Sequence, residues 1–308
     1  MIAELLAYKI LQLFAMMVIG FLLVKLKVVK SEESNLLSKI SLYLLLPAAI
    51  INAFGFKLTG EMAGGLLLAF AAAFIINTTF FVIDVLCLRH TSLAPVERAS
   101  FMYSNAANLI IPIIIFVLGE EWVVYTTAYI SVQVVYLWTH AIGLFSSEKK
   151  IEIKKIIFNP CIIAIVLGLV MLFTGLELPR FVSDITSSFS DMLGPAAMLT
   201  AGMLAAKIDF KSALKKKNVY IASIVRTVVY PIVPLAIVLL LSRVPGANTR
   251  EVLLISFLAS ITPVASTIMQ FAQVKNSDTD SAVQINIFST VLSLVTMPAW
   301  IALYELVV

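Results

Sequence analysis

The stretch SNAANLIIP, Ser104 to Pro112, lies inside a long apolar segment of the chain. It places two asparagines, Asn105 and Asn108, close to a proline. Polar side chains are costly in lipid, and a proline removes one hydrogen bond from the interior of a helix. Freed backbone groups are tolerated in a membrane only where they face protein, water or a ligand. The stretch therefore predicts a membrane helix that is interrupted at a site.

The composition is that of a membrane protein. Of 308 residues, 61% are hydrophobic and only 13% are charged, which exceeds the apolar content that a soluble core requires. We predict an all-α membrane protein with ten transmembrane helices, at 5–28, 36–55, 63–88, 98–118, 121–145, 156–174, 182–206, 218–241, 251–272 and 281–305.

Signatures of other protein classes are missing from the sequence. It contains no P-loop, no glycine-rich dinucleotide turn and no HExxH motif, and both cysteines lie in apolar context. We therefore predict a protein that is not an enzyme and has no cofactor, no bound metal and no nucleic-acid partner.

The basic residues alternate between the two sides of the predicted membrane. The connectors after the first, third, fifth, seventh and ninth segments carry most of the connector lysines and arginines. The positive-inside rule places these connectors in the cytoplasm and both termini outside it. We expect a multi-pass protein of the plasma or inner membrane.

Two halves of the chain share an ordered set of matches. Pro112 precedes Gln133 by 21 residues, and Pro263 precedes Gln284 by the same spacing. Earlier in each half, PAAIINAF (47–54) matches PAAMLTAG (195–202). We interpret residues 1–148 and 149–308 as two five-helix repeats. Because five is odd, the second repeat is inverted, which is typical of secondary transporters.

The repeats predict where a ligand binds. Helices 4 and 9 are expected to be interrupted beside Pro112 and Pro263 and to cross in the membrane. Half-helix N-termini carry partial positive charge and free N–H groups, which suit an anion. The alternative interpretation is a pair of proline kinks, with asparagines that bridge neighbouring helices.

Amides dominate the candidate site. An asparagine side chain offers two donors and an acceptor oxygen, so it binds a carboxylate without a buried cation. For Asn108 the alternative role is interhelical packing, and Ser266 and Thr267 are expected to cap the second half-helix. The full set of predicted substrate-binding residues is Asn105, Gln133, Asn108, Pro112, Pro263, Asn52, Thr200, Ser266, Thr267 and Gln284.

Few charged groups lie inside the predicted spans. Arg226 is expected to neutralise Asp191 or Asp84, or to extend to the interface, and Asp84 to reach the interface itself. His140 is a candidate for proton coupling, with a satisfied interfacial histidine as the alternative. Small residues that permit close approach of helices are Gly20, Gly168 and Gly202.

Together these features resemble the auxin efflux carrier family, which includes bacterial malate-permease-like members. The resemblance covers nearly the whole chain. It rests on Asn105 seven residues before Pro112, on Gln133 in SVQVV, on Arg226 before Pro231, and on four further stretches: NPCIIAIVLGL (159–169), LGPAAMLTAGMLAA (193–206), TPVASTIMQFAQV (262–274) and STVLSLVTMPAW (289–300).

The resemblance implies a fold related to that of bile acid/sodium symporters. A scaffold part comes from helices 1, 2, 6 and 7, and a crossover or transport part from helices 3–5 and 8–10. The substrate carboxylate lies where the broken helices cross, with Asn105 and Gln133 as its best ligands. Many plant members have NPN where this chain has Asn159-Pro160-Cys161, and their long cytoplasmic loop is missing. A small organic acid is therefore the expected substrate.

Three functions remain open at this point. The first is an elevator-type carrier of small organic anions. The second is a sodium-coupled symporter in which Asn105, Asn108, Gln133 and Gln284 ligate sodium. The third is a channel or membrane sensor on the same fold. The expected partners are a small organic acid, a proton or sodium as coupling ion, and the lipid bilayer, and a homodimer remains open.

Overall fold

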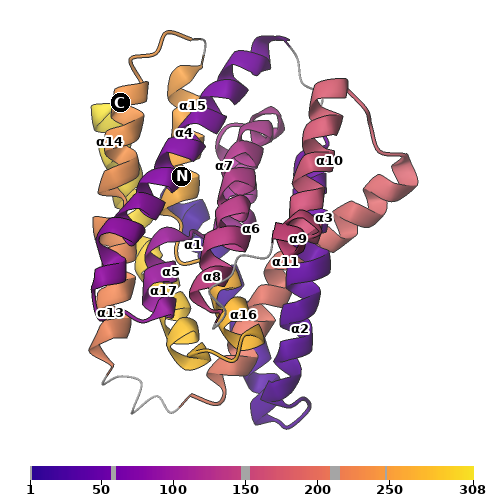
Figure 1. The fold of residues 1–308 in the computed structure, drawn as a ribbon, viewed down its shortest axis with the longest axis vertical. Helices are drawn as coiled ribbons and strands as arrows, with labels where there is room; N and C mark the ends of the chain where they lie inside the picture. Colours follow the sequence, from indigo (N-terminus) through magenta and orange to yellow (C-terminus); the bar gives the residue numbers. More distant parts are fainter. Residues whose placement is uncertain (1, 57–59, 147–152, 209–215, 247) are drawn as a thin grey trace.

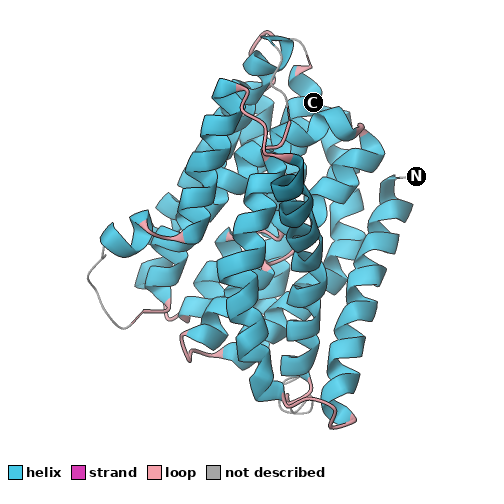
Figure 2. Ribbon diagram, turned by 90° about the vertical axis from the view of Figure 1, so that its right-hand side faces the viewer, coloured by secondary structure: helices cyan, strands magenta, loops and turns pink. Residues whose placement is uncertain are grey.

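A computed structural model describes residues 2–56, 60–146, 153–208, 216–246 and 248–308. Over these ranges the chain is a bundle of helices joined by short loops, without a named strand (Figures 1 and 2). The β-type contact in this part of the chain is an antiparallel bridge between Ser104 and Val264.

The helices of the first half follow the predicted apolar segments. Two of the segments contain a widened π-helical turn, η2 and η5, so that each is a run of consecutive helical pieces. The elements are α1 (Ile2–Lys25), α2 (Ser34–Ile40), η2 (Ser41–Leu45), α3 (Leu46–Ala53), α4 (Gly60–Leu86), α5 (Pro95–Met102), α6 (Ala106–Val117), α7 (Val123–Tyr136), η5 (Leu137–Ala141) and α8 (Ile142–Leu144).

The second half is built in the same manner, with a π-helical turn, η6, in its third long segment. The elements are α9 (Ile153–Ile157), α10 (Pro160–Thr174), α11 (Arg180–Ala205), α13 (Lys217–Ile224), η6 (Val225–Val229), α14 (Ile232–Leu241), α15 (Thr249–Ile261), α16 (Ser266–Val274) and α17 (Thr279–Val307).

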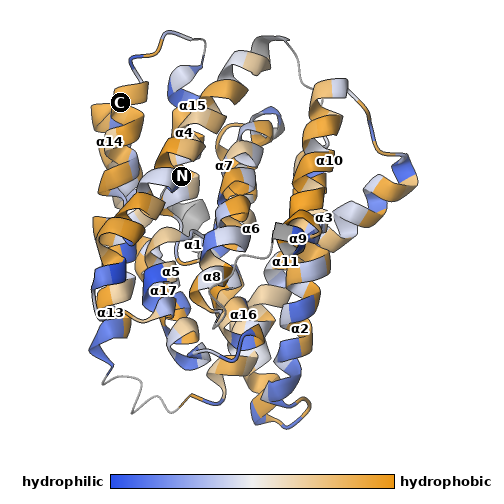
Figure 3. Ribbon diagram, viewed as in Figure 1, coloured by the Kyte–Doolittle hydropathy of each residue, from blue (hydrophilic) through white to orange (hydrophobic). Residues whose placement is uncertain are grey.

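The bundle is that of a multi-pass membrane protein. Among the described residues, 4 helical runs are long and apolar enough to cross a membrane: Ser31–Ala53, Met62–His90, Lys217–Leu241 and Thr279–Val307. Large apolar side chains such as Leu67, Phe173 and Val295 are more than 70% exposed, and Figure 3 shows mainly hydrophobic helices. Such a surface suits lipid and not water. Predicted segments 4 and 9 are missing from these runs because each is split into two short helices.

Small residues allow α1 and α11 to pack closely. A Cβ atom added to Gly202 would lie 1.9 Å from the carbonyl oxygen of Met17, and one added to Gly20 would lie 2.4 Å from that of Leu199. A Cβ atom added to Gly168 of α10 would lie 2.2 Å from the ring of Phe54. The predicted role of these three glycines in close helix approach is confirmed.

The main helix contacts divide into two groups. In one group, α11 packs against α1, α2 and α3, and α3 packs against α10. In the other group, α4 packs against α7 and α15, α6 packs against the same two helices, and α17 packs against α13 and α16. We call these the α1/α11 group and the α4/α17 group. Polar residues at the border between the groups form the site described below.

The helices predicted to be interrupted are interrupted, but one of the two breaks lies elsewhere than predicted. The breaks are at residues 103–105, between α5 and α6, and at 262–265, between α15 and α16. They cross and are joined by backbone hydrogen bonds from Asn105 N to Pro263 O (2.8 Å) and from Ala265 N to Tyr103 O (3.0 Å).

Pro263 lies in its break as predicted, whereas Pro112 lies inside α6, seven residues after Asn105. The prediction of a break beside Pro112 is therefore wrong. The helix stops at Tyr103 because its backbone pairs there with the other break, and that pairing replaces the helical hydrogen bonds. A proline within a helix produces a local kink and needs no complete interruption.

Candidate functional site

Two half-helices begin at the crossing. Asn105 is the N-cap residue of α6 and Ala265 that of α16, and neither side chain caps its helix. The first N–H groups of a helix have no partner within the helix, and the helix dipole adds partial positive charge at this end. The crossing therefore presents two sets of N–H donors to whatever lies between them.

A cavity of about 20 Å³ lies at these two N-termini. Its wall brings together Asn105, Asn108, Gln133, Ser266 and Thr267 of the predicted site. It also includes Gln270, which sequence reasoning missed. The volume is enough for a water-sized group. Leu46, Leu193 and Ala197 of α3 and α11 close its other side, so the cavity lies between the two helix groups.

The two asparagines of α6 form a pair. Asn108 Nδ2 donates to Asn105 Oδ1 at 2.7 Å. This bond leaves the two N–H donors of the Asn105 amide for a ligand, while the buried Oδ1 of Asn108 has no partner within the described part of the chain. Asn108 therefore faces the cavity and pairs with a residue of its own helix, not with a neighbouring helix.

Gln133 holds the first break in place. Its Oε1 accepts from Ser104 N (3.0 Å) and from Ser104 Oγ (2.6 Å), and its Nε2 donates to Ser104 O (2.8 Å). The side chain therefore replaces helical partners for a residue in the gap. It lines the cavity as well, with one N–H group left for a ligand.

Asn286 and Ser289 of α17 provide hydrogen-bond partners for the backbone of the second break, as Gln133 does for the first. Asn286 Nδ2 donates to Val264 O at 2.9 Å, and Val264 N donates to Ser289 Oγ at 3.2 Å. Gln284, the residue predicted for this place, is buried but does not line the cavity. The spacing from Pro263 therefore identified the correct helix but not the residues that face the break.

Several buried polar atoms at the cavity are unpaired. Ser266 Oγ and Gln270 Nε2 have no partner within the described residues, although both side chains are at most 3% exposed. An unpaired buried polar atom costs about 1–3 kcal/mol, so such atoms indicate a place where a ligand or water binds. Gln270 follows Ser266 by one helical turn, and this i, i+4 spacing was the signal that sequence reasoning could have used.

The predicted capping role of Ser266 and Thr267 is wrong. Ala265 occupies the N-cap position, and Ser266 is already the first helical residue. The backbone bond from Ala265 N to Tyr103 O fixes where the helix begins, and this places both hydroxyl side chains after the cap. They line the cavity and do not satisfy their own helix end.

A larger cavity adjoins the crossing. It has a volume of about 420 Å³ and shares Ala107, Asn108 and Leu193 with the small cavity. We call it the vestibule. Residues of α1 and α11 line its other sides, among them Lys9, Gln12, Ser190, Asp191 and Gly194. Lys9 is the cationic residue among those that line either of these two cavities.

Two residues predicted for the site lie elsewhere. Asn52 lines a separate cavity of about 150 Å³, together with Phe54 and Glu177. Thr200 is fully buried in α11 and lines none of the cavities described here. The match between 47–54 and 195–202 aligned these two positions, but it does not place their side chains together.

Arg226 binds both half-helices that end at the crossing. Its Nη1 donates to Phe101 O (3.0 Å), and its Nη2 donates to Ser260 O (2.6 Å) and Thr262 O (2.9 Å). These carbonyls are at the C-terminal ends of α5 and α15, where a helix carries partial negative charge. Neutralisation of Asp191 or Asp84 by Arg226 was therefore a wrong prediction, as was its extension to the interface, because the side chain is 1% exposed.

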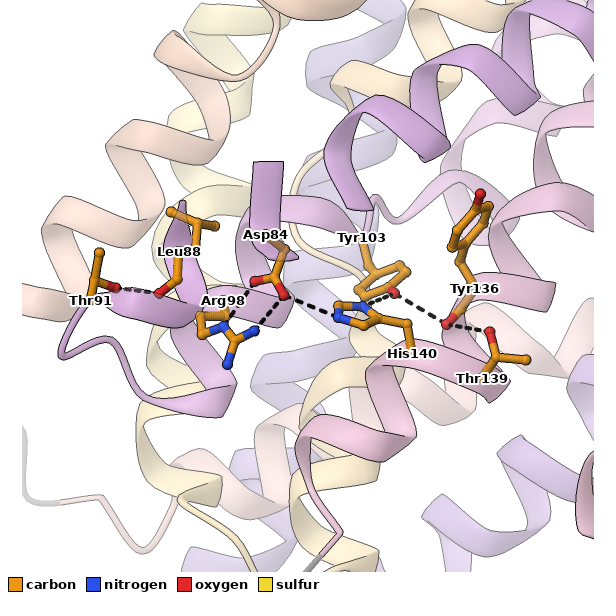
Figure 4. A network of polar contacts seen from close by, with 8 residues as sticks. All are labelled: Asp84, Leu88, Thr91, Arg98, Tyr103, Tyr136, Thr139 and His140. Carbon is orange, nitrogen blue, oxygen red and sulfur yellow. Dashed lines mark hydrogen bonds and ion pairs between the residues drawn. The ribbon is translucent and has the colours of Figure 1, made fainter. Parts of the chain in front are cut away.

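Asp84 belongs to a polar network beside the first break (Figure 4). Arg98 Nε and Nη2 donate to its two carboxylate oxygens at 2.9 and 2.5 Å, and His140 Nε2 lies 3.1 Å from Oδ2. The Asp84 side chain is fully buried, so the prediction that it reaches the interface is wrong. His140 Nδ1 lies 2.9 Å from the hydroxyl of Tyr103, the residue at which the first break begins.

A multi-pass helical protein with two interrupted helices that cross beside a polar cavity belongs to the class of membrane transport proteins. The comparison with known families agrees, because the family described as membrane transport protein matches residues 5–154 and again residues 145–301. These matches cover nearly the whole chain, and the chain belongs to this family, the auxin efflux carriers. Among curated protein sequences, no match is found.

Proposed function

We propose that this protein is a secondary transporter of small organic anions whose carboxylate binds at the helix crossing. The observation that supports this most strongly is the pair of uncapped N-termini of α6 and α16, which meet at one cavity. Unpaired N–H groups at two helix N-termini form an anion site without any charged side chain.

The electrostatics of the cavity favour modest affinity. Its described lining contains no Lys or Arg, so the donors are backbone N–H groups and the amides of Asn105, Gln133 and Gln270. Neutral donors bind a carboxylate less tightly than a bidentate arginine does. Since a carrier must release its cargo in every cycle, this arrangement suits transport better than storage of the ligand.

The sizes of the two cavities suggest how the substrate lies. The small cavity at the crossing accommodates a water-sized group, such as one oxygen of a carboxylate, whereas the vestibule accommodates the rest of a small organic acid. Lys9 and Asp191 both line the vestibule, so its described lining carries one charge of each sign, and Lys9 is the group that a second carboxylate would contact.

An elevator mechanism accounts for the position of the cavity. The donor residues belong to the α4/α17 group, and the apolar wall of Leu46, Leu193 and Ala197 belongs to the α1/α11 group. Movement of the α4/α17 group along this wall would carry the bound anion across the membrane. In this proposal residues 1–148 and 149–308 are inverted repeats and both termini are extracytoplasmic, in keeping with the basic connectors.

A sodium-coupled symporter is the second candidate. The unpaired Oδ1 of Asn108 is an oxygen that a sodium ion would use. Against it, the carbonyls at the half-helix C-termini, which are the strongest cation ligands at the crossing, are occupied by the guanidinium of Arg226. Sodium dependence of uptake into liposomes separates the two candidates, and saturation with counterflow separates both from a channel or sensor.

The first prediction concerns Asn105. Its replacement by alanine removes two donors from the anion, and a lost hydrogen bond to a charged group costs about 1.5–3 kcal/mol. We expect Asn105→Ala to lower organic-acid affinity roughly 10- to 150-fold. Calorimetry of the purified variants measures this, with an acid selected by a thermal-shift screen of the wild type.

Asn52→Ala is the matched control, because it makes the same change in a separate cavity. We expect it to bind with wild-type affinity. Unchanged affinity in Asn105→Ala, or an equal loss in Asn52→Ala, would show that the anion does not bind at the crossing.

A further inference from the structure

When the imidazole of His140 is neutral, the Tyr103 hydroxyl lies between two hydrogen-bond acceptors. His140 Nε2 lies 3.1 Å from the carboxylate of Asp84, and carboxylates accept, so Nε2 carries a proton. A neutral ring then has an unprotonated Nδ1, which accepts from the Tyr103 hydroxyl at 2.9 Å. The Tyr103 hydroxyl is, however, also 3.1 Å from the carbonyl oxygen of Tyr136, and this oxygen too can only accept.

With a neutral ring, one hydroxyl proton is shared between the two acceptors or given to one of them. When a proton is added to Nδ1, the imidazolium donates to the Tyr103 oxygen, and the Tyr103 hydroxyl becomes free to donate to Tyr136 O alone. Loss of that proton returns the Tyr103 hydroxyl to a position between two acceptors. The charge of His140 is thus transmitted to the Tyr103 side chain.

Tyr103 connects this network to the substrate site. Its carbonyl accepts from Ala265 N at 3.0 Å, and Ala265 is the N-cap residue of α16. The next residue, Ser104, is held by Gln133. A change at the Tyr103 hydroxyl therefore acts on a residue whose backbone joins the two breaks.

Asp84 and Arg98 are the charged side chains next to the imidazole in the described part of the chain. Asp84 of α4 faces Nε2, and Arg98 of α5 neutralises Asp84 from its other side. The ring of Phe81 meets the imidazole edge-on with centroids 5.0 Å apart. Tyr136 of α7 and Tyr230, which follows η6, are further titratable side chains close to Tyr103 and Asp84. At this end of α4 and α5, the described chain also contains Cys87, Arg89, His90 and Glu97, and no ion pair joins them to His140. The His140 side chain is 13% exposed.

We propose that His140 binds the coupling proton. Asp84 orients the imidazole ring, and the hydrogen bonds of the Tyr103 hydroxyl change with the charge of that ring. Imidazole changes charge between pH 5 and 8, and this is the range across which a membrane proton gradient acts. Proton binding and anion binding then influence each other through the crossing, as reciprocal linkage requires. The coupling role of His140 rests on the proposed transport function, whereas proton binding by His140 is tested separately.

The first test is NMR spectroscopy of ¹⁵N-histidine and ring-labelled tyrosine in the reconstituted protein between pH 5 and 8. The chain has 2 histidines, and His90→Gln assigns the spectrum, because His90 is exposed and outside the network. We expect the His140 signals to change from neutral to imidazolium as pH falls, and the Tyr103 signal to move with them. A Tyr103 signal that moves equally in His140→Gln, or a ring that stays neutral at pH 5, would overturn the proton site.

The second test is uptake of radiolabelled malate into proteoliposomes with the membrane potential clamped by valinomycin and equal potassium. With one proton per cycle, an inward gradient of one pH unit should raise accumulation about tenfold. Glutamine at position 140 keeps a donor and an acceptor but binds no proton, so His140→Gln should retain malate counterflow and lose this accumulation. His90→Gln should behave as the wild type.

The outcomes separate the two proposals. Malate counterflow in every variant, with a gradient response unchanged in His140→Gln, would overturn the coupling site and leave the transport function intact. Absence of counterflow in the wild type would count against transport of this acid. In that case the NMR titration still decides whether His140 binds a proton and whether the Tyr103 hydroxyl responds to it.

Discussion

At the scale of single residues, Arg226 is the side chain that joins the two interrupted helices. It is buried among apolar helices and binds three carbonyls, from Phe101, Ser260 and Thr262. The planar guanidinium presents several donors in fixed directions, which an ammonium group does not. The partial negative charge at two helix C-termini takes the place of a carboxylate partner.

We therefore expect Arg226→Met to destabilise the protein by about 3 kcal/mol or more, because several hydrogen bonds from a charged group are lost and buried carbonyls are left unpaired. Arg226→Lys should have an intermediate effect, since one ammonium group cannot reach all three carbonyls. Thermal unfolding in detergent without ligand measures this, with the exposed Arg243→Met as control. Equal unfolding temperatures for Arg226→Met and the control would show that Arg226 does not hold the two interrupted helices together.

The sequence predicted the role of single residues where that role depends on nearby residues of the chain. It was less informative where the hydrogen-bond partners are distant in sequence. Asn105 and Asn108 could be identified as candidates because amide side chains are costly in an apolar segment and are retained there mainly for function. Asn159 before Pro160 likewise begins α10, where its side chain accepts from Cys161 N at 2.9 Å. The partners of Arg226 were not predictable, because all three are backbone carbonyls, which every residue has. Gln270 was overlooked because it lies beyond the residues next to the proline.

At the scale of secondary-structure elements, the interruptions depend on tertiary contacts. The break at 103–105 contains no proline, and it exists because Gln133 and the opposite break supply the hydrogen bonds that the helix gives up. The π-helical turns η5 and η6 carry His140 and Arg226. A π-helical turn is often found at functional positions, and no periodicity in the sequence distinguished these turns from ordinary helix.

The crossing of α1 and α11 yields a prediction at this scale. A methyl group at Gly202 would overlap the carbonyl oxygen of Met17, so Gly202→Ala must push the two helices apart. Overpacking of this kind costs about 1–3 kcal/mol. Gly64→Ala in α4 is the matched control, because nothing lies within 4 Å of the added atom. Thermal unfolding should distinguish the variants, and unchanged stability of Gly202→Ala would contradict the close packing of α1 against α11.

At the scale of the whole molecule, the two helix groups are open on one side and closed on the other. The vestibule opens between Lys9 of α1 and Asp191 of α11. Toward the opposite end of α1, where α2 and α16 lie side by side, buried polar groups join the two helix groups (Figure 1). Gln273 Oε1 accepts from Ser38 Oγ at 2.6 Å, and Gln273 Nε2 donates to Ser34 Oγ at 2.6 Å. We call this contact the serine–glutamine clamp.

In the elevator cycle that we propose, the clamp would have to open before the site faces the other side of the membrane. The clamp would then stabilise the observed arrangement relative to the opposite one. A neutral hydrogen bond contributes about 1 kcal/mol, so removal of both serine hydroxyls should shift the equilibrium between the two arrangements by about 2 kcal/mol, or roughly 30-fold. The expected direction is toward the arrangement in which α2 and α16 have separated.

Hydrogen exchange of α2 and α16 in the Ser34→Ala/Ser38→Ala double variant measures this shift, and exchange should become faster in both helices. Ser41→Ala is the matched control. It removes a buried serine hydroxyl on the same helical run, but this hydroxyl has no partner in the described part of the chain. If the double variant exchanged no faster than Ser41→Ala, the clamp would not control the movement of one helix group against the other. The closed side would then have to be held by the apolar contacts between the two groups.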